Sequence, residues 1–428
     1  MKQTSLRNSV FLIALLLLLI PGYSCSLYKI SYKGKTMFGS NCDAYWTTTK
    51  IWFEPSEKSG EYGAAFIGSR MNSEGNYAPQ TGMNEEGLAF TRNAVETPLK
   101  ELRNNPTKTS ITNESDYLRN ILKKCKTVVE AKQFIEGYNF NYFSNDVFVY
   151  VDKSGSYLIV EPDTLYIASE NTFALANFCP STTDLSKVNK ARYLKGKAIL
   201  VEGIDTSINY CRALSDSMHV CRKWKGDGTL YTNIFNIQDG LIYLYFYHDY
   251  SHEVRFILKE ELDKGKHLLA LPSLFPTNKE YEELIHYYTP RNSKWAMESL
   301  VFLFLILFVT SLLLLVGLVK KKHPEKGVLI SMLASNSILL FFLILVGIRN
   351  EYFYMQAPYQ GNVFSMLDVA SYTPFLVLFM FIYLGYNLIL KNNLKVAPKF
   401  QRILFWINLI LYLICILIFT YWGLYAIY

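Results

Sequence analysis

The chain has 428 residues, of which 50% are hydrophobic and 18% are charged, and its formal net charge is +7. This length allows more than one domain, and the apolar content is high for a purely soluble protein. Much of the positive charge lies in two short basic segments between apolar runs, which argues against a nucleic-acid-binding protein, and the seven cysteines lack the paired spacings of a zinc site or a disulfide scaffold.

Residues 1–24 have the pattern of a secretory signal peptide. Two basic residues precede an apolar stretch, a proline ends it, and two small residues stand before the expected cut: Lys2, Arg7, Val10–Ile20, Pro21, Gly22 and Ser24. Cleavage at this point would make Cys25 the first residue of the exported chain. The alternative is lipoprotein processing with Cys25 lipidated, although Gly22 and Tyr23 do not match the usual motif for it.

An N-terminal Cys25 would carry two reactive groups, a thiol that attacks and an α-amine of pKa ~7.7–8.0 that can accept the proton of the thiol. The next residues predict a β-hairpin that turns at Lys33–Lys35 and returns to Asp43. If the hairpin is centred on Gly34, Cys25 lies opposite Asp43. A two-residue loop would shift this pairing by one residue and turn the side chains to the other face.

The chain from Cys25 onward predicts a mixed α and β domain. Alternating strand patterns recur along it: Ser26–Ser31, Thr36–Ser40, Ala64–Ile67, Val147–Val151, Tyr157–Glu161, Thr172–Phe178, Thr229–Asn236, Leu241–Tyr247 and Glu253–Leu258. Helical patterns cover Thr112–Tyr138, interpreted as two helices, and Val188–Glu202. Strands, then helices, then strands favour an α+β layered sandwich. The proline-containing segment Leu268–Tyr288 is the expected boundary, and the predicted domain comprises residues 25–290.

The composition changes after Arg291, where four apolar runs follow one another: Ser299–Val319, Val328–Ile348, Pro374–Leu390 and Ile403–Tyr425. Each is long enough, or nearly so, to cross a hydrocarbon core of ~30 Å, and we expect four transmembrane helices in residues 291–428. The middle of each run lacks acidic and basic residues, which argues against an ion path. Polar residues such as Asn336 are expected to hydrogen-bond between helices.

Basic residues separate the first two and the last two apolar runs: Lys320, Lys321, Lys322 and Lys326, and then Lys391, Lys395, Lys399 and Arg402. The positive-inside rule assigns both segments to the cytoplasmic side, which places residues 25–290 outside. The export signal independently favours the same arrangement. We therefore expect a multi-pass protein of the cell membrane with its 25–290 domain on the extracytoplasmic side.

Two motifs carry a resemblance to a known family. The first lies within Cys25–Trp46, where Gly39–Asp43 reads Gly-Ser-Asn-Cys-Asp, and the second is Gly82–Leu88, Gly-Met-Asn-Glu-Glu-Gly-Leu. These segments resemble the N-terminal-nucleophile amidase group, which takes in choloylglycine (bile salt) hydrolases, penicillin V acylases, acyl-CoA:6-aminopenicillanic acid acyltransferases and linear amide C–N hydrolases. The resemblance continues through Ala176–Phe178, Lys187–Leu194 and Thr229–Leu258. It covers nearly all of residues 25–265 but not the membrane segment.

The resemblance implies an αββα sandwich and a set of site residues. Cys25 would be the nucleophile, and Asp43 would hold its α-amine. Asn177 would donate its side-chain amide to the oxyanion, and Asn93 matches a second oxyanion contact with a one-residue gap. Arg192 would lie beside the nucleophile, where a cation lowers the pKa of a thiol.

Three further features of the sequence limit the substrates and cofactors that we expect. Bile salt hydrolases have an arginine where this chain has Ser40, which argues against a bile salt hydrolase proper. His248 and His252 are interpreted as solvated residues of a hairpin loop rather than a metal pair. The sequence lacks nucleotide and phosphate-binding motifs, and we expect no cofactor and no metal.

The resemblance thus implies an exported, membrane-anchored hydrolase that cleaves linear amide C–N bonds of small N-acyl substrates through an acyl-enzyme. Two alternatives remain open. One is an acyltransferase that passes the acyl group to an amine or a thiol. The other is a non-catalytic binding module, lipidated at Cys25 or held by its membrane helices. The expected partners are the amide substrate and the lipid bilayer, not nucleic acid; the acyl chain, the amine and the oligomeric state stay undetermined.

Overall fold

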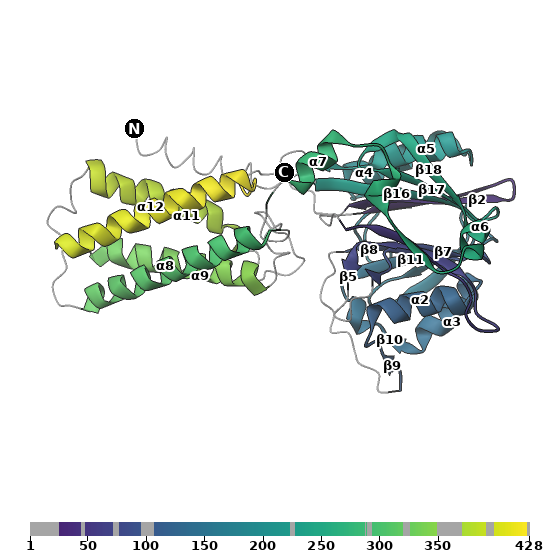
Figure 1. Cartoon of the computed structure of the whole chain (residues 1–428), viewed down its shortest axis with the longest axis horizontal. Coiled ribbons are helices and arrows are strands. Elements are labelled where there is room, and N and C mark those ends of the chain that lie inside the picture. The colour runs from purple at the N-terminus through teal and green to yellow at the C-terminus, as the bar shows by residue number, and fades with distance from the viewer. Residues whose placement is uncertain are drawn as a thin grey trace. The chain divides into compact units, whose positions relative to one another are not determined.

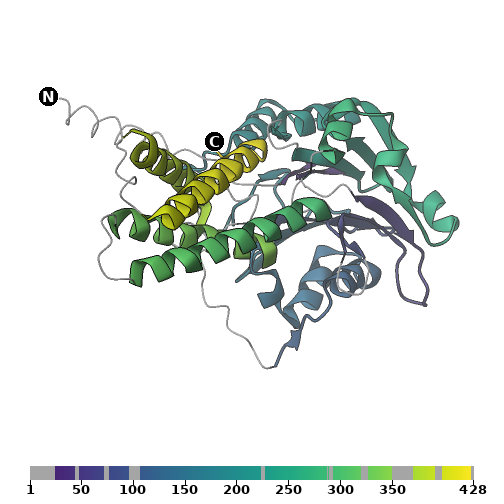
Figure 2. The ribbon, with the colours of Figure 1, turned by 60° about the vertical axis from the view of Figure 1, so that its left-hand side comes forward.

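The computed structural model describes residues 25–43, 48–71, 77–95, 107–222, 227–286, 288, 293–319, 326–348, 370–390 and 398–425 (Figures 1 and 2). These residues form two compact units, one that ends at Ile285 and another that begins at His286. The expected signal peptide, together with the lysines at positions 320–322, 391 and 395, lies outside the described residues.

The first unit is built on two large antiparallel sheets. Within the described residues, the first sheet has the strand order β14-β1-β2-β16-β17-β18, with β15 paired to β16. Its strands are β1 (Ser26–Tyr32), β2 (Lys35–Asp43), β14 (Thr172–Leu175), β15 (Cys221–Arg222), β16 (Asp227–Asn236), β17 (Leu241–Phe246) and β18 (Asp249–Ile257). The central position of β1 and β2 places the start of the domain in the middle of this sheet.

The second sheet has the order β13-β12-β11-β8-β7-β4-β3-β19 within the described residues. Its strands are β3 (Lys50–Glu54), β4 (Ala64–Gly68), β7 (Thr81–Asn84), β8 (Ala89–Ala94), β11 (Asp146–Val151), β12 (Tyr157–Val160), β13 (Leu165–Ala168) and β19 (His267–Ala270). Two short pairs complete the strands: β5 (Arg70–Met71) with β6 (Tyr77–Ala78), and β9 (Thr109–Ser110) with β10 (Tyr138–Asn139).

Helices cover the outer face of each sheet (Figure 1). The helices of this unit are α2 (Glu114–Lys124), α3 (Val128–Glu136), α4 (Ala191–Glu202), α5 (Ile208–Met218), α6 (Leu258–Asp263) and α7 (Lys279–Ile285). Side chains alternate along a strand, so Leu27 of β1 packs inward with Met83 of the second sheet, whereas Ile30 packs outward with Leu214 of α5. Helices α2 and α3 cover the second sheet in the same way. The expected mixed α and β domain is confirmed, and its layers follow the order helix, sheet, sheet, helix.

The β1–β2 hairpin has a two-residue loop, Lys33-Gly34. Both loop residues have positive φ values, 50° and 76°, as in the two-residue turns whose twist matches that of the flanking strands. Tyr32 therefore pairs with Lys35, and the same register continued to the start of the strand sets Cys25 opposite residue 42. The pairing of Cys25 with Asp43, expected for a hairpin centred on Gly34, is wrong by one residue.

The second unit is a bundle of apolar helices: α8 (Lys294–Val319), α9 (Lys326–Ile348), α11 (Thr373–Gly385), which continues as a π-helical turn at Tyr386–Leu390, and α12 (Lys399–Tyr421). Helices α8 and α11 each pack against both α9 and α12. Asn336 of α9 donates hydrogen bonds to Ser311 Oγ (3.0 Å) on α8 and to Asn408 Oδ1 (2.9 Å) on α12. This buried polar contact is the interhelical hydrogen bonding that the sequence predicts for Asn336.

Three helices, not the expected four, are long enough and apolar enough to cross a membrane among the described residues: Lys294–Leu318, Lys326–Gly347 and Lys399–Tyr421. The third expected span begins at Thr373, with Pro374 in its first turn, a position that suits proline. Its α-helical part has 13 residues, which rise by roughly 20 Å, less than the ~30 Å of a hydrocarbon core. The expectation of four membrane-length helices is therefore corrected to three with a shorter apolar helix between them.

Candidate active site

Cys25 lies in a row of side chains that crosses the first sheet. The β1–β2 register, continued by one residue, places Cys42 opposite Cys25, and β2 pairs Cys42 with Tyr231 of β16. On the other side, β14 pairs with β1 as far as Leu27 and Leu175, and Asn177 follows two residues after that pair. The β1–β2 hairpin, β14 and β16 are distant in sequence but adjacent in the sheet, and they bring Asn177, Cys25, Cys42 and Tyr231 to the same part of it.

The surroundings of the Cys25 thiol favour its ionised form. Cys25 is buried, with 7% of the residue exposed. The pKa of its thiol is lowered from the ordinary value, chiefly because the Cys42 thiol donates a hydrogen bond to it. Burial and the Asp43 carboxylate oppose the shift, whereas the backbone N–H of Asp43 and the charge of Arg192 support it. Since the thiolate is the nucleophile, the site favours the reactive form.

Arg192, in the first turn of α4, joins two of the expected site residues. Its Nη1 donates to Oδ2 of Asp43 (3.2 Å), and its Nη2 donates to Oδ1 of Asn177 (2.5 Å). The Arg192 and Asp43 side chains are 9% and 4% exposed, so solvent screens this ion pair little. The guanidinium therefore holds the side chains of β2 and of the segment after β14 around the thiol.

Asn93 and Asn177 connect the two sheets at the site. Asn93 of β8 directs its Nδ2 at the carbonyl oxygen of Cys25 (3.5 Å), and Asn177 donates from Nδ2 to the carbonyl oxygen of Ala94 (2.5 Å). The first distance is at the outer limit of a hydrogen bond. Oδ1 of Asn93 is buried without a hydrogen-bond partner among the described residues. All five residues expected at the site, Cys25, Asp43, Asn93, Asn177 and Arg192, thus lie together, although both amides contact backbone rather than an open position.

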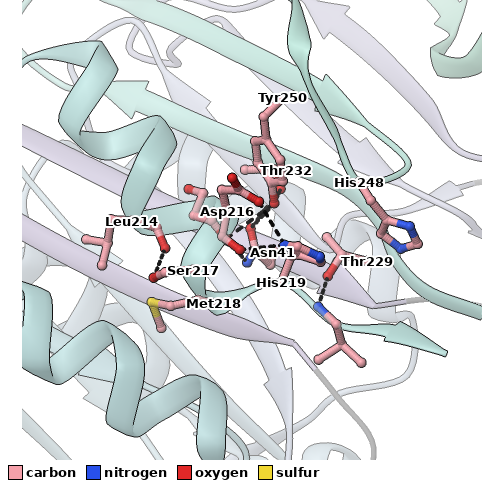
Figure 3. Close-up of polar contacts among 12 residues, drawn as sticks. Asn41, Leu214, Asp216, Ser217, Met218, His219, Thr229, Thr232, His248 and Tyr250 are labelled. Atoms are coloured by element: carbon pink, nitrogen blue, oxygen red, sulfur yellow. Dashed lines mark hydrogen bonds and ion pairs between the residues drawn. The ribbon is translucent and has the colours of Figure 1, made fainter.

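Thr229 is a site residue that the sequence did not point to. Its Oγ1 donates to Oδ1 of Asp43 (2.6 Å). The same oxygen accepts from the backbone N–H of Val220 (3.0 Å), the dashed line at Thr229 in Figure 3. Asp43 is therefore held by Arg192 at one oxygen and by Thr229 at the other. A threonine at the start of a strand carries no local signal of this role, because the contact depends on the pairing of β16 with β2.

Asn41 anchors the same end of β2 to α5 (Figure 3). Its Nδ2 donates to the carbonyl oxygen of Ser215 (2.8 Å), and its Oδ1 accepts from Thr232 Oγ1 (2.7 Å). The Tyr250 hydroxyl lies 2.9 Å from Thr232 Oγ1 and completes the group. A buried network whose members are hydrogen-bonded rigidifies its surroundings, so this one holds the β2 strand two residues from Asp43.

The inner face of the sheet continues from Cys42 to Ser40. Ser40 Oγ donates to Oδ1 of Asn233 (2.7 Å), and both residues are buried. Nδ2 of Asn233 lacks a hydrogen-bond partner among the described residues. A polar, uncharged pair therefore stands next to the row that contains Cys25.

The two histidines of the β17–β18 hairpin differ. His252 belongs to strand β18 rather than to the loop, but its side chain is 53% exposed, as expected for a solvated residue, and lies 2.7 Å from Asp249 Oδ2. The side chain of His248 is 8% exposed, lies 3.6 Å from Glu280 and stacks on His219, so the interpretation of His248 as solvated is wrong. Its positive φ of 64° fits a two-residue hairpin turn. Within the described ranges, the structure contains no group of three or more His, Cys, Asp or Glu side chains that could hold a metal ion.

This chain aligns with solved structures of low sequence identity. A match to this chain is found neither among the models of protein families nor among curated proteins. Two crystal structures that align with it are variants of the conjugated bile acid hydrolase of Clostridium perfringens. One is 15% identical with a TM-score of 0.45, and the other is 14% identical with a TM-score of 0.44. Each alignment covers 60% of this chain and 98% of the other.

Proposed function

We propose that this chain is a membrane-associated cysteine amidase that hydrolyses linear amide bonds with Cys25 as its N-terminal nucleophile. The observation that carries the proposal is the environment of Cys25. A buried thiol with a lowered pKa lies with Asp43, Arg192 and two asparagine amides, and it belongs to the residue that follows the expected signal cut. A nucleophile, a base and oxyanion donors are the parts that acyl transfer needs.

Signal cleavage would complete the site, because only then does Cys25 have an α-amine. The amine accepts the proton of the thiol, and the carboxylate of Asp43 holds the resulting ammonium. Arg192 and Thr229 hold that carboxylate in place through its two oxygens. The Cys25 sulfur then attacks the amide carbon, and the new S–C bond places negative charge on the former carbonyl oxygen.

The amide groups of Asn177 and Asn93 stabilise this oxyanion. An amide nitrogen has two hydrogens, so Asn177 can keep its bond to Ala94 while it donates the second hydrogen to the oxyanion. The long contact from Asn93 to the Cys25 carbonyl is weak enough to be exchanged for a charged acceptor. Collapse of the intermediate breaks the C–N bond, and the α-ammonium protonates the leaving amine. Water then hydrolyses the thioester and restores the free thiol.

The substrate that suits this site is a small N-acyl amide. The uncharged pair Ser40–Asn233 next to the Cys25 row offers hydrogen bonds rather than a positive charge, so we expect no preference for an anionic group there. The three membrane-length helices favour association with a bilayer, where N-acylated amphiphiles concentrate. We propose that the domain lies on the extracytoplasmic side, since the lysines between α8 and α9 belong inside by the positive-inside rule.

The test uses the full chain purified in detergent with reductant and a panel of N-acyl amides that differ in chain length. Intact mass should show a chain that begins with an unmodified Cys25, and amine release should be measurable. Cys25→Ala should reduce turnover to the uncatalysed rate, and Cys125→Ala, at a buried thiol outside the site, should retain it. Undiminished turnover in Cys25→Ala, or a lipid adduct on Cys25 in the mature protein, would overturn the proposal. Free acid as the product identifies water as the acceptor, whereas acyl transfer to an added amine would contradict the assignment as a hydrolase.

A further inference from the structure

We propose that Cys25 and Cys42 form a reversible disulfide that removes the nucleophile from the amidase site under oxidising conditions. The evidence for the disulfide is the placement of the two cysteines in the hairpin, whereas its effect on turnover rests on the proposed function. Cys42 has no role in the amidase chemistry described above beyond its hydrogen bond to Cys25.

The one-residue register shift of the hairpin is what brings the two sulfurs together. Residues directly opposite in an antiparallel ladder have Cα atoms about 4.5 or 5.5 Å apart, and disulfides need Cα separations of about 4.4–6.8 Å. Both side chains belong to the cluster between the sheets, and the two thiols are hydrogen-bonded to each other. Both are free thiols in the structure. Closure of the bond therefore needs little movement of the backbone.

The other buried cysteines near the sheets differ in reactivity. Burial raises the pKa of Cys125, Cys179 and Cys211 to about 12 each, which leaves these thiols protonated and unreactive at neutral pH. The pKa of Cys25 moves the other way. An oxidant that reaches the described part of the chain should therefore react first at Cys25.

The chemistry balances with a low-molecular-weight disulfide as the oxidant. The Cys25 thiolate attacks one sulfur of the small disulfide, a mixed disulfide forms, and the first small thiolate leaves. The Cys42 sulfur then attacks the Cys25 sulfur, the Cys25–Cys42 bond forms, and the second small thiolate leaves and takes up the Cys42 proton. The protein dithiol loses two electrons and the small disulfide gains two. A dithiol that reverses the exchange restores both cysteines.

The first step removes the main cause of the raised pKa of Cys42, and this favours the second step. In the reduced protein the pKa of Cys42 is raised, chiefly because the Cys42 thiol donates a hydrogen bond to the Cys25 sulfur. A Cys25 held in a mixed disulfide has no charge, so this cause disappears. Burial and the Asp43 carboxylate still raise the pKa of Cys42 after this step, whereas a hydrogen bond from Tyr231 lowers it. Exported proteins meet oxidising conditions, which gives such a pair of thiols a setting in which it would operate.

The experiment treats the reduced full chain in detergent with oxidised glutathione, followed by alkylation of free thiols and non-reducing peptide mapping. We expect a linked peptide pair containing Cys25 and Cys42, a mass lower by two hydrogens, and a loss of amide hydrolysis equal to the linked fraction. Dithiothreitol should restore both. Cys42→Ser should instead accumulate a glutathione adduct on Cys25, while Cys211→Ser should form the link normally.

The outcomes separate the two proposals. An active reduced enzyme that gives no Cys25–Cys42 peptide, or that stays fully active while linked, would overturn the inference and leave the amidase standing. A linked peptide in a reduced protein that hydrolyses no amide would uphold the disulfide and overturn the proposed function. Equal glutathione adducts on Cys25 in the native chain and in Cys42→Ser would show that Cys42 does not resolve the mixed disulfide, and would also overturn the inference.

Discussion

Arg192 donates a hydrogen bond to Asp43 over 3.2 Å, although 149 positions separate them in the chain. This contact sets a cation from helix α4 beside the carboxylate at the end of β2, next to the Cys25 thiol. The same guanidinium also holds Asn177. The proposed nucleophile and its proposed oxyanion donor therefore depend on one side chain.

Replacement of Arg192 should change the pH dependence of turnover. The charge of Arg192 lowers the pKa of Cys25, and the carboxylate of Asp43 raises it. Arg192→Met removes the first effect while the second remains, so the thiol pKa rises and the ascending limb of kcat/KM moves to higher pH. Below that limb, kcat/KM should fall about tenfold for every pH unit by which the limb moves. Lys195→Met, on the exposed side of α4, is the control; an unchanged limb in Arg192→Met would show that the cation does not act on the thiol.

Asn177→Ala should reduce kcat more than it raises KM. Loss of one oxyanion donor typically costs about 10²–10³ in rate, because the interaction strengthens as charge develops on the oxygen. The variant also loses the bonds to Ala94 and Arg192, so its thermal midpoint must be measured beside the kinetics. Asn171→Ala, at an exposed asparagine just before β14, should leave both parameters unchanged. A fall in kcat/KM caused by KM alone would assign Asn177 to substrate binding.

Gly34→Ala should destabilise the first unit through the hairpin turn. Gly34 has a φ of 76°, and a Cβ added there meets nothing within 4 Å, so the cost is conformational and amounts to about 1–2 kcal/mol. Gly203 is a matched control, because its φ is 175° and its added Cβ is also unobstructed. Denaturation should show a lower midpoint for Gly34→Ala than for Gly203→Ala; equal midpoints would mean that the turn carries no such constraint.

Asn336→Leu should weaken the helix bundle. Asn336 bonds to Ser311 and Asn408 and accepts from the Tyr412 hydroxyl (2.5 Å), and its replacement removes these three hydrogen bonds between helices. Hydrogen bonds between membrane helices are worth about 0.6–2 kcal/mol each. Ser337→Ala is the control, since Ser337 donates to the carbonyl of Leu333 in its own helix. Thermal unfolding in detergent should separate the two variants, and equal stability would show that the network does not hold the bundle.

Much of the fold class was predictable from the sequence. Alternation and helical periodicity depend on neighbouring residues alone, and they indicated the mixed α and β domain and the apolar segment. The two short motifs, Gly39–Asp43 and Gly82–Leu88, carry the resemblance that predicts Cys25 and Asp43 as site residues. Asn177 and Arg192 came from the same resemblance, and the structure places them beside these two residues.

Only the tertiary structure decided which side chains meet. The hairpin register depends on the two positive φ angles of Lys33 and Gly34. A shift of this register by one residue makes Cys42, rather than Asp43, the partner of Cys25. The contact of Thr229 with Asp43 and the burial of His248 likewise depend on how distant segments pack. The sequence by itself determined the residue types and the local patterns, because these are set by near neighbours along the chain. The pairings were decided by the fold, because turn geometry and strand order bring together residues that the sequence holds far apart.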